Sequence, residues 1–120
     1  MAKPKEQVPV ENLDLYVRLL ETNPNIELKG ASMPYTSLNG NMFTFLSELG
    51  VGIRLPKDVR EEFLKKYHSK LYEAHGTILK EYVAVPDKLL KNTFELKKYL
   101  DLSYEYAKTL KPKSSKKKKG

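Results

Sequence analysis

The sequence predicts an α+β fold, an antiparallel sheet of about four to five strands with flanking helices on one side. Near both ends of the chain, apolar residues recur at the three- and four-residue spacing of an amphipathic helix. In the middle, apolar and polar residues alternate between glycines and prolines, which is typical of short strands. The expected order is therefore helix, strand, strand meander, helix, strand and helix.

Length and composition favour one folded domain. The chain has 120 residues, of which 40% are hydrophobic, and this suffices for a single compact core. We expect residues 1–10 to form a flexible lead-in, residues 11–110 the folded domain, and residues 111–120 a disordered lysine-rich tail. The absence of cysteine excludes disulfides, thiolate metal sites and cysteine nucleophiles, and it fits a reducing compartment.

The first helix is predicted to have Asn12 as its N-cap and to end before Pro24, because the residue preceding a proline disfavours helical backbone angles. Its apolar face consists of Leu13, Tyr16, Val17 and Leu20. Ile26 and Leu28 then alternate with charged residues ahead of a glycine. This alternation predicts a short, half-buried strand.

A meander of strands is predicted for the middle of the chain. Residues 33–38 are ambiguous between strand and loop. The dipeptide Asn39-Gly40 is the strongest short-range hairpin signal, since a type I′ turn needs positive φ at both central positions. Strands are expected over residues 42–46 and 51–55, joined by a second tight connection that ends in a glycine.

The second half begins with a helix that Pro56 opens and that continues to about residue 68, since proline suits the first helical turn. Residues 69–76 are interpreted as an irregular connection. Residues 77–85 form the longest run of strand-favouring residues and are expected to join the same sheet.

The last helix carries the clearest signals. Asn92 followed by Glu95 has the form of a capping box, and Pro112 ends the helix. Its buried face is predicted to contain Leu96, Tyr99, Leu100, Ser103, Ala107 and Leu110. Tyrosines here and at position 82 would suit an aromatic platform for nucleic-acid bases, but packing at the margin of the core is the simpler interpretation.

No catalytic or metal-binding arrangement is evident. The only histidines, His68 and His75, are separated by a polar stretch, and no acidic residue stands at a spacing that completes a zinc site. No serine lies in a nucleophile-elbow motif, and the glycines form no phosphate-binding loop. We therefore expect no enzyme activity, no cofactor and no bound metal. An enzyme would need perturbed carboxylates or histidines clustered in a deep pocket.

The net charge of +7 is concentrated at the C-terminus. Residues 111–120 contain six lysines and no acid: Lys111, Lys113, Lys116, Lys117, Lys118 and Lys119. Subtracting six from +7 leaves +1 for residues 1–110, so the count alone indicates no basic face on the folded part. The lysines are candidates for salt-sensitive contacts with nucleic acid, and equally for a solubilising extension or weak binding to anionic membrane surfaces.

No stretch of the sequence approaches the about 20 apolar residues that cross a bilayer. The first residues are polar and lack the apolar core of a signal peptide. We therefore expect a cytoplasmic protein without membrane insertion.

Four segments carry a family resemblance. They are Gly40-Asn41-Met42-Phe43, Gly52-Ile53-Arg54-Leu55-Pro56, Tyr82-Val83-Ala84-Val85-Pro86 and the helix over residues 95–110. In this order they resemble the TfoX N-terminal domain family, over about residues 13–110. The resemblance implies helices flanking an antiparallel sheet of about five strands, and a regulatory role.

The chain departs from the family pattern in two places. Where the family often carries a Met-Phe-Gly-Gly-like segment, this chain reads Ser32-Met33-Pro34-Tyr35-Thr36. Where full-length TfoX-type competence regulators continue into a C-terminal helical domain, this sequence has lysines.

These observations favour a non-enzymatic binding or regulatory module that acts through an unknown protein partner or through self-association. A sheet covered by helices on one side leaves its other face or an edge free for a partner. The candidate binding surface is Tyr35, Asn39, Asn41, Arg54 and Tyr82. The alternative is a nucleic-acid-associated protein that uses its basic tail.

Overall fold

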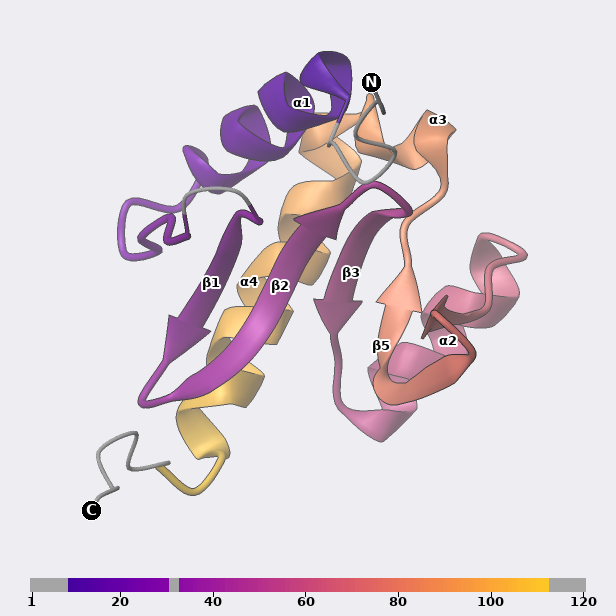
Figure 1. The fold of residues 1–120 in the computed structure, drawn as a ribbon. Helices are drawn as coiled ribbons and strands as arrows, with labels where there is room; N and C mark the ends of the chain where they lie inside the picture. The colour runs from indigo at the N-terminus through magenta and orange to yellow at the C-terminus, as the bar shows by residue number, and fades with distance from the viewer. Residues whose placement is uncertain (1–8, 31–32, 113–120) are drawn as a thin grey trace.

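The computed structural model describes residues 9–30 and 33–112 of the chain (Figure 1). The helices are α1 (Val10–Leu20), α2 (Lys57–Lys66), α3 (Asp87–Leu90) and α4 (Thr93–Thr109). The strands are β1 (Tyr35–Leu38), β2 (Asn41–Ser47), β3 (Gly50–Arg54), β4 (Leu71–Ala74) and β5 (Thr77–Ala84). Most of the predicted lead-in and tail, residues 1–8 and 113–120, lies outside the described residues.

The strands form one antiparallel sheet in the order β1-β2-β3-β5-β4. Figure 1 shows α4 crossing behind the first three strands of this order. The turn Asn39-Gly40 joins β1 to β2 with φ angles of 55° and 82°, as the hairpin signal required. The prediction of an α+β fold with a meander and one antiparallel sheet is confirmed, and residues 33–38 supply its fifth strand.

The core lies between the sheet and the helices. The strands contribute Phe43, Leu46, Val51, Ile53 and Val83, and the helices contribute Tyr16, Leu19, Phe63, Leu96, Tyr99 and Leu100. Full burial of one such side chain stabilises the fold by roughly 1.5–3 kcal/mol. The buried hydroxyl of Tyr16 is hydrogen-bonded to Thr44 at 2.8 Å, so the one polar group of this ring is satisfied.

Helix α4 has the N-cap and most of the buried face that its sequence predicted. The side chain of Asn92 accepts a hydrogen bond from the backbone N–H of Glu95 at 3.1 Å and caps the helix. Of the predicted face, every residue except Leu110 is buried. The small side chain of Ser103 lets the helix approach the strands, and its hydroxyl donates to the carbonyl of Arg54 at 2.5 Å.

The prediction of a strand around Ile26 and Leu28 is wrong. Lys29 alone forms an isolated bridge, to Tyr35, before the chain turns away. Gly30 makes this turn with φ of +84°, and a Cβ atom there would stand 2.4 Å from the carbonyl oxygen of Met33. Apolar and polar residues do alternate in this segment, but the turn at Gly30 follows so closely that the segment cannot pair as a strand.

The prediction of an irregular connection over residues 69–76 is also wrong. This segment contains β4, which pairs with β5 through a tight turn at His75-Gly76 with φ angles of 52° and 82°. Histidine is among the non-glycine residues that occupy the left-handed region, but it is a weaker hairpin signal than asparagine. Helix α1 begins at Val10 with Pro9 as its N-cap, earlier than predicted, and the short α3 was not predicted.

The β4–β5 hairpin curves over the sheet face that the helices leave uncovered. In the sheet order β4 neighbours β5, yet its Tyr72 hydroxyl is hydrogen-bonded to Ser47 Oγ at 2.7 Å and to the carbonyl of Gly50 at 3.1 Å. These partners lie at the end of β2 and the start of β3. Tyr72 is 2% exposed without belonging to the main core, so this face has a small packed cluster of its own.

Candidate functional site

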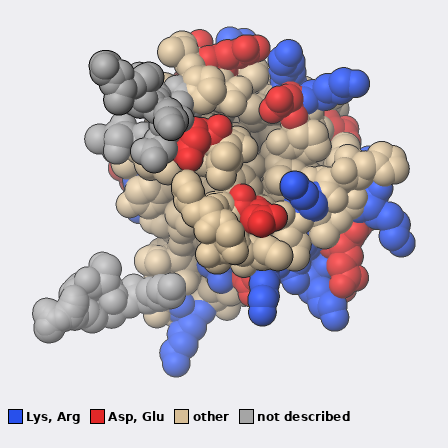
Figure 2. All heavy atoms as spheres, turned by 45° about the vertical axis from the view of Figure 1, so that its right-hand side comes forward, with Lys and Arg blue, Asp and Glu red and all other residues tan. Residues whose placement is uncertain are grey.

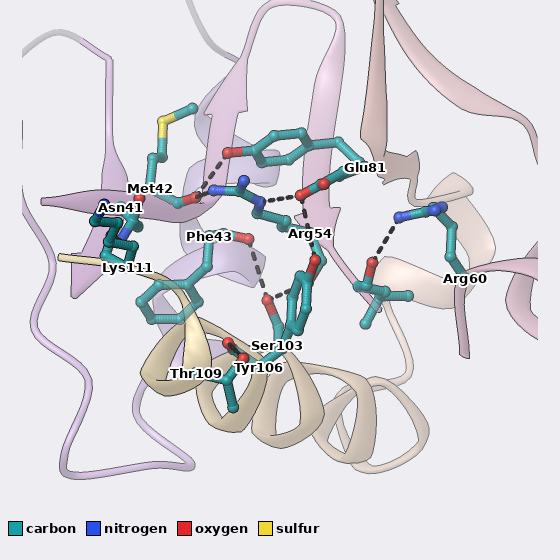
Figure 3. A network of polar contacts seen from close by, with 12 residues as sticks. Asn41, Met42, Phe43, Arg54, Arg60, Glu81, Ser103, Tyr106, Thr109 and Lys111 are labelled. Atoms are coloured by element: carbon teal, nitrogen blue, oxygen red, sulfur yellow. Dashed lines mark hydrogen bonds and ion pairs between the residues drawn. The ribbon is translucent and has the colours of Figure 1, made fainter. Parts of the chain in front are cut away.

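The structure gathers most of the sequence-predicted surface at one end of the sheet. Asn41, Arg54 and Tyr82 lie near the end of α4, and Asn39 is at the tip of the adjoining hairpin (Figure 3). Tyr35 is at the far end of β1, opposite Phe45, and is half-buried.

Arg54 is the centre of the contacts at this end. Its Nε donates to Glu81 Oε1 at 2.7 Å, and its guanidinium lies 5.7 Å from the centre of the Tyr82 ring. The Tyr82 hydroxyl donates to the carbonyl of Met42 at 2.7 Å, and Arg54 Nη1 approaches the same oxygen at 3.4 Å. The Tyr106 hydroxyl reaches Glu81 Oε1 from α4 at 3.5 Å. Arg54 is therefore held in one orientation while its side chain stays 20% exposed.

The ionisation of these groups follows from their neighbours. Partial burial alone would lower the pKa of Arg54, but the hydrogen bond to Glu81 raises it overall, so the guanidinium stays charged. Burial raises the pKa of Tyr82, which the nearby Arg54 partly offsets. Tyr82 is thus a neutral hydrogen-bond donor at physiological pH.

Asn41 connects this end of the sheet to the end of α4. Its side chain is 4% exposed, and Nδ2 donates to the backbone carbonyl of Lys111 at 2.9 Å (Figure 3). The two residues are 70 positions apart in the chain. This contact holds residue 111 against the start of β2.

Toward the same end of the sheet lie four basic residues, which we name the basic end: Arg54, Lys57, Arg60 and Lys111. Figure 3 shows Arg60 and Lys111 on opposite sides of Arg54. Arg54 ends β3, Lys57 opens α2, and Arg60 Nη1 donates to the carbonyl of Leu55 at 2.9 Å. In Figure 1 the end of α4 lies at the lower left and the start of α2 to the right of it, both below the end of β3. Figure 2 shows lysine and arginine side chains projecting along this lower edge.

The sheet face opposite the helices carries aromatic residues. Phe45 alternates in β2 with Thr44 and Leu46, which are buried on the helix side, so its ring points the other way. The ring centre lies 4.7 Å from that of Tyr72 and 5.3 Å from that of Tyr82. A Cβ atom on Gly52, opposite Phe45, would stand 2.6 Å from the ring, so only glycine leaves room for it.

Sequence reasoning missed Phe45, Tyr72 and Glu81 as members of this surface. Phe45 was assigned to a strand without a face, and Tyr72 lay in the segment interpreted as irregular. The glycine at position 52, inside a strand, was the one available signal, because such a glycine often marks a close approach of another group.

A second concave region lies between α2, α3 and the start of α4. It has a volume of about 490 Å³ and is lined by residues that include Tyr67, His68, Leu89 and Glu95. Tyr67 donates a hydrogen bond to Glu95 Oε2, and Lys66 Nζ approaches the same oxygen at 3.3 Å.

These contacts keep both groups of that region in their ordinary ionisation states. Hydrogen bonds from Tyr67 and then Lys66 lower the pKa of Glu95, whereas burial and the bond to Glu95 raise the pKa of Tyr67. At neutral pH the carboxylate is thus ionised and the phenol protonated. Neither group is poised near neutrality as a general acid or base requires.

The described residues show neither a metal cluster nor a membrane span. Within residues 9–30 and 33–112, no group of three or more His, Cys, Asp or Glu side chains is placed to hold a metal ion. In the same part of the chain, no helix has the length and apolar character that a membrane span needs. His75 lies 3.8 Å from Glu48 at the hairpin tip and is 76% exposed.

Comparison with known proteins gave no family model, curated protein or solved structure that matches this chain. The resemblance to the TfoX N-terminal domain family therefore stays a prediction. What the protein does has to be argued from two surfaces, the sheet face opposite the helices and the basic end.

Proposed function

We propose that this protein is a non-enzymatic binding module that associates with another protein through the sheet face opposite the helices. The register of the strands supports a continuous surface. Tyr35 is paired with Phe45, and Arg54 with Tyr82, and directly paired residues share one face of a sheet. We name these four residues the uncovered face. The regulatory role implied by the family resemblance belongs to this proposal.

The composition of the uncovered face carries the proposal. Aromatic residues and arginine are enriched in protein–protein interfaces, and tyrosine and arginine are frequent among the residues that contribute most binding energy. Both types occur here on a surface that no described helix covers.

The uncovered face is ordered before any partner arrives. Arg54 is held by Glu81 and lies against Tyr82, and Phe45 is supported by Tyr72. Immobilising a free side chain on binding costs roughly 0.5–1.5 kcal/mol, and this cost is reduced where packing has already fixed the rotamer.

The edges of the sheet are less suited to partners than the face. β1 and β4 are each four residues long, and each contains a register shift against its neighbour. The bridge from Lys29 covers part of β1, and Glu73 places a charge on β4. Short, irregular and charged edge strands resist strand addition. β5 is paired with β3 and β4 and has no free edge.

Photo-crosslinking tests the proposal even though the partner is unidentified. Tyr35→p-benzoylphenylalanine places a crosslinker on the uncovered face, and Phe94→p-benzoylphenylalanine is the matched control on an 88% exposed residue of α4. After irradiation in cells, position 35 is expected to give a discrete protein adduct, including a dimer if the partner is a second copy. Adducts of equal yield from position 94, or none from position 35, would contradict the proposal.

A further inference from the structure

We propose that the concave region between α2, α3 and the start of α4 binds a small organic anion, a molecule with an apolar body and one carboxylate or phosphate group. We name this region the α3 pocket. Its lining residues include Tyr67, His68, Pro86, Lys88, Asn92 and Glu95. The proposal concerns a second ligand and does not depend on the protein partner of the uncovered face.

Two segments that are distant in the sequence form the α3 pocket. Ser69 Oγ donates a hydrogen bond to the carbonyl of Ala84, and the Ala84 N–H donates to the carbonyl of Lys70 at 2.9 Å. These bonds hold the chain that leaves α2 against the end of β5, which leads directly into α3. The fold therefore fixes the position of one wall of the pocket relative to the other.

The size and the walls of the pocket suit a small molecule. Its volume of about 490 Å³ lies within the range of about 300–1,000 Å³ that is usual for small-molecule sites. Pro86, Leu89 and Tyr67 supply mostly apolar surface. The ring of Tyr67 is itself held in place by Phe63, with 4.8 Å between the ring centres. An apolar body of the ligand would pack against these side chains.

The charges around the pocket favour an anion. Glu95 is the one carboxylate among the lining residues, and its Oε2 already accepts a hydrogen bond from Tyr67. Lys66 and Lys98 place their Nζ atoms 3.3 and 3.5 Å from the same oxygen. Lys88 lines the pocket and forms no ion pair within the described residues. Three lysines and one carboxylate leave a net charge of +2, which attracts an anion and repels a cation.

Asn92 offers the anion a hydrogen-bond donor in a fixed orientation. Its Oδ1 accepts from the backbone N–H of Glu95 at 3.1 Å, which caps α4. The opposite atom of the amide, Nδ2, makes no hydrogen bond within the described residues. Because the cap already holds the side chain, little rotamer freedom is lost when Nδ2 donates to a ligand.

His68 occupies a position where glycine is the more favourable residue. The Ser69 N–H donates to the carbonyl of Leu64 at 3.0 Å, which closes α2 with a Schellman motif. His68 is the left-handed residue of this motif, with φ of 52°. A β-carbon is disfavoured in this conformation, so a side chain there suggests a role beyond ending the helix. His68 lines the pocket, and an imidazole carries at least one N–H donor in either protonation state.

Titration of the isotope-labelled full chain, followed by the NMR shifts of its backbone amides, tests the proposal. The probes are four small aromatic molecules of similar size: phenyl phosphate, benzoate, benzyl alcohol and benzylamine. At neutral pH the two anions are expected to bind with a dissociation constant of about 1 mM, as suits ligands of this size. Saturable shifts are expected at His68, Lys88, Asn92 and Glu95. The tighter of the two anions identifies the anionic group of the ligand.

Three variants test the residues of the pocket. Lys88→Gln removes one charge and is expected to weaken binding of the anions about five-fold. Asn92→Asp keeps the cap of α4, since aspartate caps equally well, but replaces the Nδ2 donor by a negative charge. Its affinity is expected to fall about ten-fold or more. His68→Gly is expected to weaken binding about two-fold without lowering the melting temperature, because glycine suits the end of α2.

Lys91→Gln is the matched control. Its side chain is 64% exposed, and Lys91 lies between the lining residues Lys88 and Asn92 in the sequence without lining the pocket itself. The variant removes the same charge as Lys88→Gln and should bind both anions as wild type does.

Three results would overturn the proposal. The first is that neither anion produces saturable shifts at the α3 pocket, or that the shifts centre on other residues. The second is binding of benzylamine as tight as that of the anions, which would mean that the lysines do not determine the charge of the ligand. The third is wild-type affinity in both Lys88→Gln and a folded Asn92→Asp.

Discussion

The two faces of the sheet are filled by different means. Toward the helices, side chains such as Leu46, Ile53 and Val83 are 0% exposed and belong to one core cluster with residues of α1, α2, α3 and α4. On the opposite face, Phe45 stays partly exposed, and among the described residues the rings of Tyr72 and Tyr82 from the curved β4–β5 hairpin lie against it. We propose that the difference separates two tasks: the helix side provides stability, whereas the uncovered face keeps aromatic surface available for a partner.

The largest expected effect contrasts one side chain from each side of the sheet. Leu100→Ala is expected to lower the free energy of unfolding by about 3 kcal/mol, because it leaves a cavity in a fully buried site. Phe45→Ala is expected to lower it by about 1.5 kcal/mol, since part of its ring is already in water. Urea denaturation measures both values. Equal losses would mean that the uncovered face is a second core and not a reserved surface.

Gly52→Ala tests how closely the aromatic cluster fits. The added Cβ would stand 2.6 Å from the Phe45 ring, so the expected loss of stability is about 2 kcal/mol. In the double variant with Phe45→Leu, which makes room for the methyl group, much of this loss should be recovered. Strictly additive losses in denaturation experiments would show that the contact is relieved elsewhere.

The smallest expected effect concerns the Tyr72 hydroxyl, which hydrogen-bonds the β4–β5 hairpin to the end of β2 and the start of β3. Tyr72→Phe removes the hydrogen bonds to Ser47 and Gly50 and is expected to lower stability by about 1 kcal/mol at neutral pH. Thermal denaturation of the variant beside wild type provides the measurement.

The same variant has a predictable pH dependence. Burial raises the pKa of Tyr72 above its ordinary value of 10.0. Below pH 10 the hydroxyl is protonated in both the folded and the unfolded chain, so wild type keeps the stability that its hydrogen bonds contribute. Above pH 10 the hydroxyl ionises first in the unfolded chain, which favours unfolding, so this contribution to stability is lost. The difference in melting temperature between wild type and Tyr72→Phe should therefore narrow above pH 10. A constant difference across this range would contradict the burial of the hydroxyl.

The helix side of this comparison is the part that the sequence predicts well. The spacing of Leu96, Leu100 and Ser103 marks one face of a long helix, and Asn92 marks its start. Asn39-Gly40 determines the first hairpin because few residues tolerate its backbone angles. These signals are local, so a single sequence contains them.

The uncovered face and the basic end depend on contacts between distant residues. Arg54 and Glu81 are 27 positions apart, and Asn41 and Lys111 are 70 apart, and no local pattern links either pair. The hairpin at His75-Gly76 lacks a strong turn signal, so β4 and its Tyr72 were not predicted. The sequence identified Arg54, Asn41 and Tyr82 as candidates, but not the arrangement that brings them together.

The most direct test of the central claim combines binding and stability in one pair of proteins. The crosslinker at position 35 is introduced into wild type and into Arg54→Gln, and adduct yield and melting temperature are measured together. Because Arg54 is partly exposed, its ion pair with Glu81 is worth about 1 kcal/mol or less to stability. The account predicts a lost adduct with little change in melting temperature. A wild-type adduct yield from Arg54→Gln, or a loss that occurs only with unfolding, would contradict it.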